Sequence, residues 1–245
     1  MSTLDGEVVV VTGASRGLGR SMAERFGAEG ARVVLTARDE DRLETVAAGV
    51  EEPLVVPGDV REAETAERVV DRAVETFGRV DTLVNNAGVS LLGMTDSRTP
   101  IQEVSVERLD TVLEVNLRGV FLLTRAALPR MYEQGRGNVI NISSGLGRRA
   151  IAGAGPYVSS KWGLEGLTRV TAMEGEDRGV NANALDPGGR VNTDIWGHLP
   201  EEERAEIRQP DVMDDAAVLL AAQGPDGVTG ESMTADEWER RLGGE

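Results

Sequence analysis

A tyrosine and a lysine four residues apart are the side chains of this sequence best suited to acid–base chemistry. Tyr157 and Lys161 would lie on the same face of a helix, because residues at this spacing are helical neighbours. A nearby cation favours the ionised form of a phenol, whose pKa is ordinarily about 10, and so makes it a usable proton donor or acceptor near neutral pH. Taken alone, the same spacing also occurs in ordinary exposed helix pairs.

Lysine usage in the chain singles out one of these two positions. The chain has 26 lysines and arginines, and Lys161 is the only lysine among them. Arginine carries a planar, permanently charged fork, whereas lysine carries a compact ammonium that can lose its proton. We therefore expect position 161 to require an ammonium group, as a proton-transfer site does.

Length and composition limit the possible functions. At 245 residues without an internal repeat, the chain has room for a single α/β domain covering residues 1–245. No apolar run approaches the roughly 20 residues of a membrane span, and residues 1–7 lack a signal-peptide pattern, so we predict a cytoplasmic protein. With no cysteine and a single histidine, His198, we expect no metal site.

The net charge of −16, from 42 acidic and 26 basic residues, opposes binding to nucleic acid or to an anionic membrane. We expect neither as a partner. An acidic surface almost without lysine indicates a halophilic protein, and a codon bias toward arginine, alanine and glycine is the alternative explanation. Activity and melting temperature that stay unchanged between low and molar salt would speak against halophily.

Short β-branched runs alternate with amphipathic stretches along the chain. Strands are expected at residues 7–12, 32–37, 54–57, 81–85, 138–142 and 180–185, and helices at 21–30, 39–49, 61–77, 105–133, 156–177 and 211–222. This alternation predicts a doubly wound Rossmann-type domain with a parallel sheet of six to seven strands.

The two halves of the expected domain differ in role. Residues 1–135 would bind a cofactor, and residues 136–245 would supply catalysis and substrate binding. Residues 189–210 are long enough for a mobile lid, in which Trp196, Leu199 and Ile207 could line an apolar pocket or form a short helix docked on the body. After residue 222 the sequence is expected to continue as a charged tail.

A glycine-rich turn follows the first expected strand and precedes a helix. Gly13, Gly17 and Gly19 would let the backbone approach a phosphate at the helix N-terminus. Their spacing is G-xxx-G-x-G, which differs from the simplest dinucleotide fingerprint, and a plain tight turn is the alternative.

The end of the second expected strand bears on the choice of cofactor. A carboxylate there would bind the adenosine ribose of NAD, whereas a small residue next to an arginine suits the 2′-phosphate of NADP. The chain has Ala37 and Arg38 at this point, and Arg16 could add a second cation. Asp39 is the competing ribose ligand, although it opens a helical pattern and fits an N-cap. We predict NADP(H) rather than NAD(H).

Taken in order, several motifs resemble the short-chain dehydrogenase/reductase family over nearly the whole chain. Each motif is weakly specific, but the ordered set is highly specific. The motifs are TGASRGLG at residues 12–19, Asp59-Val60, NNAG at residues 85–88, Asn116 in EVNLRG, Ser144 thirteen residues before Tyr157, Lys161, and Pro187-Gly188.

The resemblance implies an oxidoreductase in which NADP(H) exchanges hydride with a carbonyl or secondary alcohol. Tyr157 would be the general acid/base, Lys161 would lower its pKa and hold the nicotinamide ribose, Ser144 would steady the substrate oxygen, and Asn116 would keep a water in the proton relay. The cofactor-binding residues that it implies are Gly13, Ser15, Arg16, Gly17, Leu18, Gly19, Arg38, Asp59, Val60, Asn86, Ala87, Gly88, Tyr157, Lys161, Pro187, Gly188, Val191 and Thr193.

The chain departs from the family pattern at two places. The segment from Pro187 to Thr193 carries one extra residue, and Thr229-Gly230 is not followed by the usual Asp-Gly pair. The second departure affects the last strand and the tetramer contact that it often makes. The homo-oligomer that the family implies, a dimer or tetramer, is therefore expected through the long helices at residues 105–133 and 156–177.

Other functions remain to be weighed. A serine hydrolase is disfavoured because Ser144 lacks a G-x-S-x-G context and the single histidine is distant. A non-catalytic NAD(P)-binding sensor on the same fold is the stronger alternative. The substrate would be a small carbonyl or alcohol, with a ketoacyl thioester, a sugar and a simple ketone all open; residues 91–101, 145–155 and 194–209 would select it.

Overall fold

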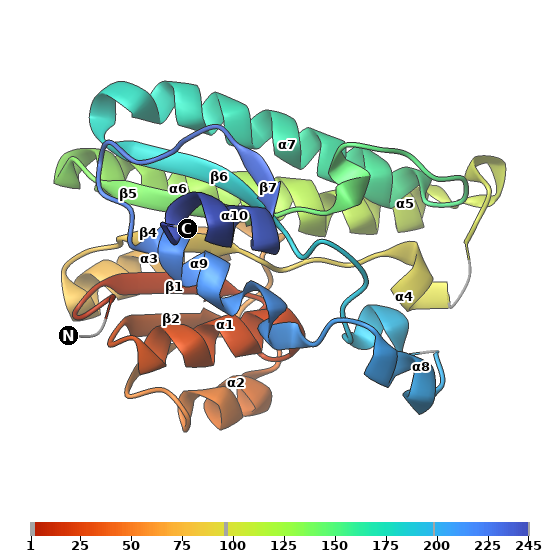
Figure 1. The fold of residues 1–245 in the computed structure, drawn as a ribbon, viewed down its shortest axis with the longest axis horizontal. Helices are drawn as coiled ribbons and strands as arrows, with labels where there is room; N and C mark the ends of the chain where they lie inside the picture. Colours follow the sequence, from red (N-terminus) through yellow and green to blue (C-terminus); the bar gives the residue numbers. More distant parts are fainter. Residues whose placement is uncertain (1–2, 96–97, 198, 245) are drawn as a thin grey trace.

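The computed structural model describes residues 3–95, 98–197 and 199–244, which form a seven-stranded parallel sheet between two layers of helices (Figure 1). His198 lies outside the described residues. The strand order is β3-β2-β1-β4-β5-β6-β7. The strands are β1 (Val8–Thr12), β2 (Arg32–Thr36), β3 (Glu52–Val55), β4 (Thr82–Asn85), β5 (Gly137–Ile142), β6 (Val180–Asp186) and β7 (Ser232–Thr234). The predicted doubly wound α/β fold is confirmed.

The valine run of β1 is explained by burial on both faces of the sheet. Val9 and Val11 belong to one hydrophobic core, and Val8 and Val10 belong to the core on the opposite face. A strand covered by helices on both sides needs no polar alternation. Strand β1 therefore occupies the centre of the sheet, and its carboxyl end opens at the point where the strand order reverses.

Helices cover the two faces of the sheet separately. One face packs against α1 (Gly17–Ala28), α2 (Glu40–Ala47), α9 (Asp214–Ala221) and α10 (Ala235–Leu242). The other packs against α3 (Ala63–Phe77), α6 (Val120–Gln134) and α7 (Gly155–Gly175). Two short helices, α4 (Leu91–Thr95) and α8 (Glu201–Glu206), lie beyond one end of the sheet (Figure 1). Within the described ranges, no helix is long and apolar enough to span a bilayer.

The helix expected over residues 105–133 is not a regular α-helix throughout. It consists of α5 (Val106–Leu113), a π-helical stretch at Glu114–Gly119, and α6. The π-helical stretch contains the buried Asn116, whose side chain hydrogen-bonds outside the helix. Such stretches insert an extra residue into the helical turn and often mark functional sites.

The sequence after residue 222, which was expected to be only a charged tail, contains β7 and α10. Strand β7 pairs in parallel with β6. Thr234 and Glu237 form a capping box at the start of α10. Trp238 is fully buried in this helix and donates its indole N–H to the carbonyl oxygen of Ala184 over 3.0 Å. The helix is amphipathic, and Trp238 supplies most of its buried face. Because the neighbouring residues are charged, the apolar face of this helix is difficult to recognise in the sequence.

We predict that Trp238→Ala lowers the free energy of unfolding by about 3–5 kcal/mol, because it removes a large buried ring and leaves the Ala184 carbonyl without its donor. Urea denaturation measures the change. The control is Arg241→Ala on the exposed face of the same helix, expected to change stability by less than about 0.5 kcal/mol. Equal effects of the two substitutions would show that α10 is not anchored by Trp238.

Candidate functional site

A cleft of about 850 Å³ opens at the carboxyl edge of the sheet. Its walls come from the loops that follow six of the strands, β1 to β6, so residues distant in sequence meet there. Of the residues expected to bind the cofactor or to act in catalysis, those in the wall are Gly13, Ser15, Arg16, Gly17, Leu18, Arg38, Asp59, Val60, Asn86, Ala87, Gly88, Ser144, Tyr157, Lys161, Pro187, Val191 and Thr193. Gly19, Gly188 and Asn116 are not among the residues that line the cleft; Gly19 and Asn116 are buried, whereas Gly188 is exposed.

The glycine turn after β1 is built for close backbone approach. Gly13 has φ 65°, and a Cβ on Gly19 would lie 2.4 Å from the carbonyl oxygen of Gly13. The hydroxyl of Thr12 accepts hydrogen bonds from the backbone N–H groups of Asn86 and Ala87, over 2.9 and 3.0 Å. This tethers the loop after β4 to the glycine turn and holds both loops at the cleft.

The N-terminus of α1 is left open toward the cleft. Among the described residues, no side chain caps it and no acidic residue occupies its first turn. By contrast, the N-terminus of α2 is capped by the side chain of Asp39. Free N–H groups at the positive end of a helix dipole form a binding site for a phosphate, so the donor set fits a dinucleotide.

The residues expected to select NADP have different surroundings. Arg38 lines the cleft with an exposed side chain. Asp39 accepts a hydrogen bond from the backbone N–H of Arg42 over 3.1 Å and pairs with that arginine's side chain. Asp39 is thus engaged as an N-cap, as the sequence indicated. Arg16, which was expected to add a second cation, forms an ion pair with Asp194.

Helix α7 brings Tyr157 and Lys161 together, and Pro156 lies in its first turn. The Nζ of Lys161 lies 5.7 Å from the centroid of the Tyr157 ring and donates a hydrogen bond to the Ile142 carbonyl oxygen over 2.7 Å. The lysine side chain is 5% exposed. A buried ammonium is therefore fixed beside the phenol at the end of β5.

Burial dominates the protonation of this pair. It raises the pKa of Tyr157 to about 12, and a hydrogen bond with Ser144 opposes the rise. Burial also lowers the pKa of Lys161 to about 8, while Glu165 and Asp186 act in the opposite direction. The expectation that the lysine lowers the tyrosine pKa is thus not met in the protein alone. The sequence gives the spacing of the two groups but not the desolvation of the phenol.

Ser144 and Asn116 support the pair in different ways. The Oγ of Ser144 accepts a hydrogen bond from the backbone N–H of Leu146 over 3.2 Å. The Asn116 amide exchanges two hydrogen bonds with the backbone of Val89 and donates a third to the Oγ of Ser160 over 3.1 Å. Ser160 in turn donates to the carbonyl oxygen of Tyr157 over 2.8 Å. Asn116 therefore links the loop after β4 to the first turns of α7.

The segments expected to select a substrate meet the same cleft. Leu91, Leu92, Met94 and Arg98 line it, whereas residues 96–97 lie outside the described residues. Trp196 from the expected lid also lines the cleft, with the guanidinium of Arg190 5.3 Å from its ring centroid. Leu199 and Ile207, the other apolar residues of the expected lid, do not line the cleft, and the short helix α8 lies between them without including any of the three.

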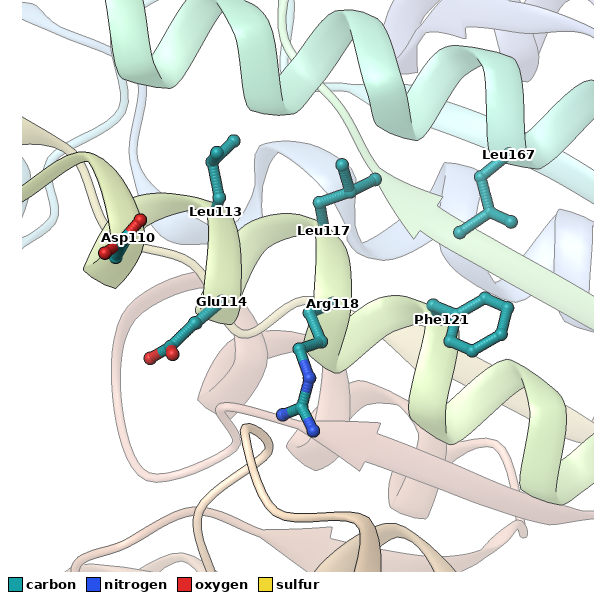
Figure 2. A pocket seen from close by; sticks show the side chains of 7 residues that line it. All are labelled: Asp110, Leu113, Glu114, Leu117, Arg118, Phe121 and Leu167. Atoms are coloured by element: carbon teal, nitrogen blue, oxygen red, sulfur yellow. The ribbon is translucent and has the colours of Figure 1, made fainter. Parts of the chain in front are cut away.

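A second hollow of about 430 Å³ lies on the helical face, away from the sheet edge. Figure 2 shows Leu113 and Leu117 pointing toward α7, with Glu114 and Arg118 pointing away from it. Phe121 and Leu167 complete its apolar lining. This surface suits packing more than proton transfer, so the cleft at the sheet edge is the candidate active site.

The sequence of this chain matches the family model described as short chain dehydrogenase over residues 7–204. The chain belongs to this family. The short-chain dehydrogenases are oxidoreductases that bind a nicotinamide cofactor. The expected family is confirmed.

Two curated relatives and one solved structure illustrate the similarity of this short-chain dehydrogenase to known proteins. It is 31% identical to the 2,5-dichloro-2,5-cyclohexadiene-1,4-diol dehydrogenase LinX of Sphingobium indicum, over 95% of this chain and 96% of that protein. It is 30% identical to the 3-oxoacyl-(acyl-carrier-protein) reductase FabG of Thermotoga maritima, over 95% and 97%. A Sinorhizobium meliloti protein described as a short-chain alcohol dehydrogenase matches it with TM-score 0.84 at 30% identity, over 95% of both chains.

Some residues of the site were missed from the sequence. Two buried carboxylates near Lys161, Glu165 and Asp186, are joined by ion pairs to the more exposed Arg148. Glu165 follows Lys161 by four residues, so the helical spacing that identified the tyrosine could also have identified this carboxylate. Arg148 lies in an irregular segment and Asp186 is the last residue of β6, and neither has a comparable helical spacing to Lys161 in the sequence.

Proposed function

We propose that this chain is an NADP-dependent oxidoreductase that exchanges hydride with a carbonyl or secondary alcohol, with Tyr157 as general acid/base. The observation that carries the proposal is the pairing of Tyr157 with the buried Lys161 in the cleft wall, with Ser144 hydrogen-bonded to the phenol. A non-catalytic sensor would need the open N-terminus of α1 but not this pair. The pair therefore favours the enzyme.

The proposed roles follow from the state of each group. A bound nicotinamide supplies or accepts the hydride. Burial keeps the Tyr157 phenol protonated at neutral pH, so it can donate to an oxygen on which negative charge develops. Ser144 provides the second hydrogen-bond donor to that oxygen. Lys161 has donated one N–H to Ile142, which leaves two for the cofactor ribose.

The remaining proposed roles concern the relay and the cofactor. Asn116 would hold the water that returns a proton toward Lys161, since its amide already joins Val89 to Ser160. We propose NADP(H) because Arg38 lines the cleft while Asp39 is engaged at its own helix. The pairing of Arg16 with Asp194 leaves Arg38 as the main residue for the 2′-phosphate.

We propose one domain over residues 1–245, with a cofactor half at 1–135, a catalytic half at 136–245 and a lid at about 189–210. Limited proteolysis that cut near residue 135 and released a stable half would contradict the single domain. Cleavage within 189–210 slowed by cofactor would support the lid. We also propose that the protein is cytoplasmic, and the low lysine content and acidic surface support a cytoplasm of high salt.

Substituting Tyr157 by phenylalanine is expected to lower kcat by about 10²–10⁴-fold or more while the cofactor still binds, because only the proton donor is lost. Lys161→Arg should also lower kcat, since a planar fork does not replace the ammonium. A screen of carbonyls and alcohols followed by nicotinamide absorbance measures both. Tyr132→Phe, which alters the other tyrosine of the chain, is the control. Near-normal turnover by either active-site variant would disprove the assignment.

For the cofactor, NADPH is expected to bind more tightly than NADH, and Arg38→Ala to remove about 10- to 100-fold of that preference, the worth of a charged hydrogen bond. Fluorescence titration of both nucleotides gives the ratio without turnover. Arg72→Ala on the exposed face of α3 serves as the matched control. A wild-type protein that prefers NADH would contradict the proposal.

We further propose a homodimer through α6 and α7. Four large apolar residues of these helices have about half or more of their surface exposed: Phe121, Trp162, Val170 and, at 76%, Met173. Phe121 also lines the apolar hollow of Figure 2. Met173→Glu should therefore shift the protein toward monomer in sedimentation velocity, whereas Glu174→Gln beside it should not. A wild-type protein that is monomeric at all concentrations would exclude the dimer, and a tetramer would require a further contact.

A further inference from the structure

Two buried carboxylates lie behind the proposed catalytic pair and have no role in the proposed function. Glu165 on α7 is 4% exposed, and Asp186 at the end of β6 is 3% exposed. Arg148, in the loop after β5, contacts both. Burying charged groups is unfavourable unless they are paired and hydrogen-bonded, so both carboxylates need partners inside the protein.

Glu165 is held by donors from three different segments. Its Oε1 accepts hydrogen bonds from the Oγ of Ser143 over 2.5 Å, from the Oγ of Ser232 over 2.8 Å and from the Nη1 of Arg148 over 3.4 Å. An ionised carboxylate can accept all three at once, and the bond from Ser143 has the short distance of a charge-assisted hydrogen bond. Ser143 follows β5 and Ser232 begins β7, so the carboxylate joins both strands to α7.

Asp186 is fixed by the same arginine. The Nη2 of Arg148 donates to its Oδ2 over 2.7 Å, and the backbone N–H of Gly188 donates to its Oδ1 over 2.9 Å. Arg148 also donates from Nη1 to the Oγ of Ser232 over 2.5 Å. One guanidinium therefore positions two carboxylates relative to each other, as its planar fork allows.

Lys161 is close to this group but not paired with it. Glu165 lies one helical turn after it, yet the described residues place no carboxylate oxygen within ion-pair distance of its Nζ, which donates to the Ile142 carbonyl oxygen instead. A direct ion pair would occupy the N–H groups of the lysine. Carboxylates acting through space leave those groups available.

We propose that Glu165 and Asp186, held together by Arg148, are positioning residues that keep the buried Lys161 in its ammonium form while leaving its N–H groups free for the reaction. The importance of that ammonium for turnover rests on the proposed function. The electrostatic effect of the carboxylates on Lys161 does not.

The charges around Lys161 support this direction. Burial lowers the pKa of Lys161 to about 8, and Glu165 followed by Asp186 raises it against that effect. The groups that act on Lys161 are Glu165 and the phenol of Tyr157 on α7, Asp186 at the end of β6, and the Ile142 carbonyl at the end of β5. Arg148 pairs with both carboxylates. Removing either carboxylate charge should make the lysine lose its proton at lower pH.

The single lysine of the chain makes a direct test possible, because ¹³C-lysine labelling gives one lysine spin system in the NMR spectrum. Following its ε-carbon shift against pH in the protein alone reports Lys161 without turnover. Glu165→Gln keeps the shape and removes the charge, and it is expected to displace the titration toward lower pH by about one unit, the order for one charge a helical turn away. Glu165→Asp restores the charge and should return the titration toward that of the wild type.

The controls separate a charge effect from a structural one. Glu174→Gln removes an exposed carboxylate from the same helix and should leave the titration unchanged. Circular dichroism verifies that each variant is folded, and if Glu165→Gln does not fold, Asp186→Asn is expected to displace the titration in the same direction. A folded Glu165→Gln or Asp186→Asn protein with the wild-type titration overturns the proposal.

Turnover then tests the link to the reaction separately. In Glu165→Gln the alkaline limb of kcat/KM should move with the NMR titration. If the titration moves and the alkaline limb does not, the carboxylates act as proposed, and the role of the Lys161 ammonium in the proposed function fails. A wild-type protein without any turnover likewise counts against the proposed function alone.

Discussion

The burial of one ammonium beside one phenol is the constraint on which the rest of this site depends. Desolvation favours the neutral forms of both Tyr157 and Lys161, so the protein alone is poised with a protonated phenol and a lysine that titrates at about pH 8. An acid catalyst needs the first state, while nucleotide binding and proton relay need the lysine charged. Burial and nearby charges therefore act in opposite directions on the pKa of Lys161, and small changes in those charges decide whether the lysine is protonated.

The surrounding elements position the groups of the cleft. Strand β5 ends at Ile142, whose carbonyl accepts from the ammonium, and the next residues supply Ser143 for Glu165 and Ser144 for the phenol. The π-helical stretch directs Asn116 toward Ser160 on α7. At the other end of the cleft the open N-terminus of α1 and the exposed Arg38 give an acidic protein a local site for anions. The overall charge of −16 thus describes the surface and not the cleft.

The sequence was sufficient for the parts of the fold that are strongly patterned. The valines of β1 occupy both faces of a buried strand, and the glycine turn, the Asn86–Gly88 loop and the Tyr157–Lys161 pair meet at one edge because parallel strands bring their carboxyl ends together. It was insufficient where tertiary contacts override local pattern. Trp238 anchors a helix whose sequence is so highly charged that an unstructured tail was expected. Arg16 forms an ion pair with Asp194, a residue far from it in the sequence. The direction of the Tyr157 pKa shift depends on burial, which the spacing of residues does not indicate.

The most direct test of the account is the ionisation of Tyr157 itself. The chain has two tyrosines, so ¹³C-tyrosine NMR with Tyr132→Phe isolates the Tyr157 signal. In the protein alone the phenol should remain protonated beyond pH 10, where an exposed tyrosine ionises, and saturation with oxidised NADP should bring its ionisation to clearly lower pH. A phenol that ionises near pH 10 in the protein alone, or one whose ionisation is indifferent to the nucleotide, would contradict the account.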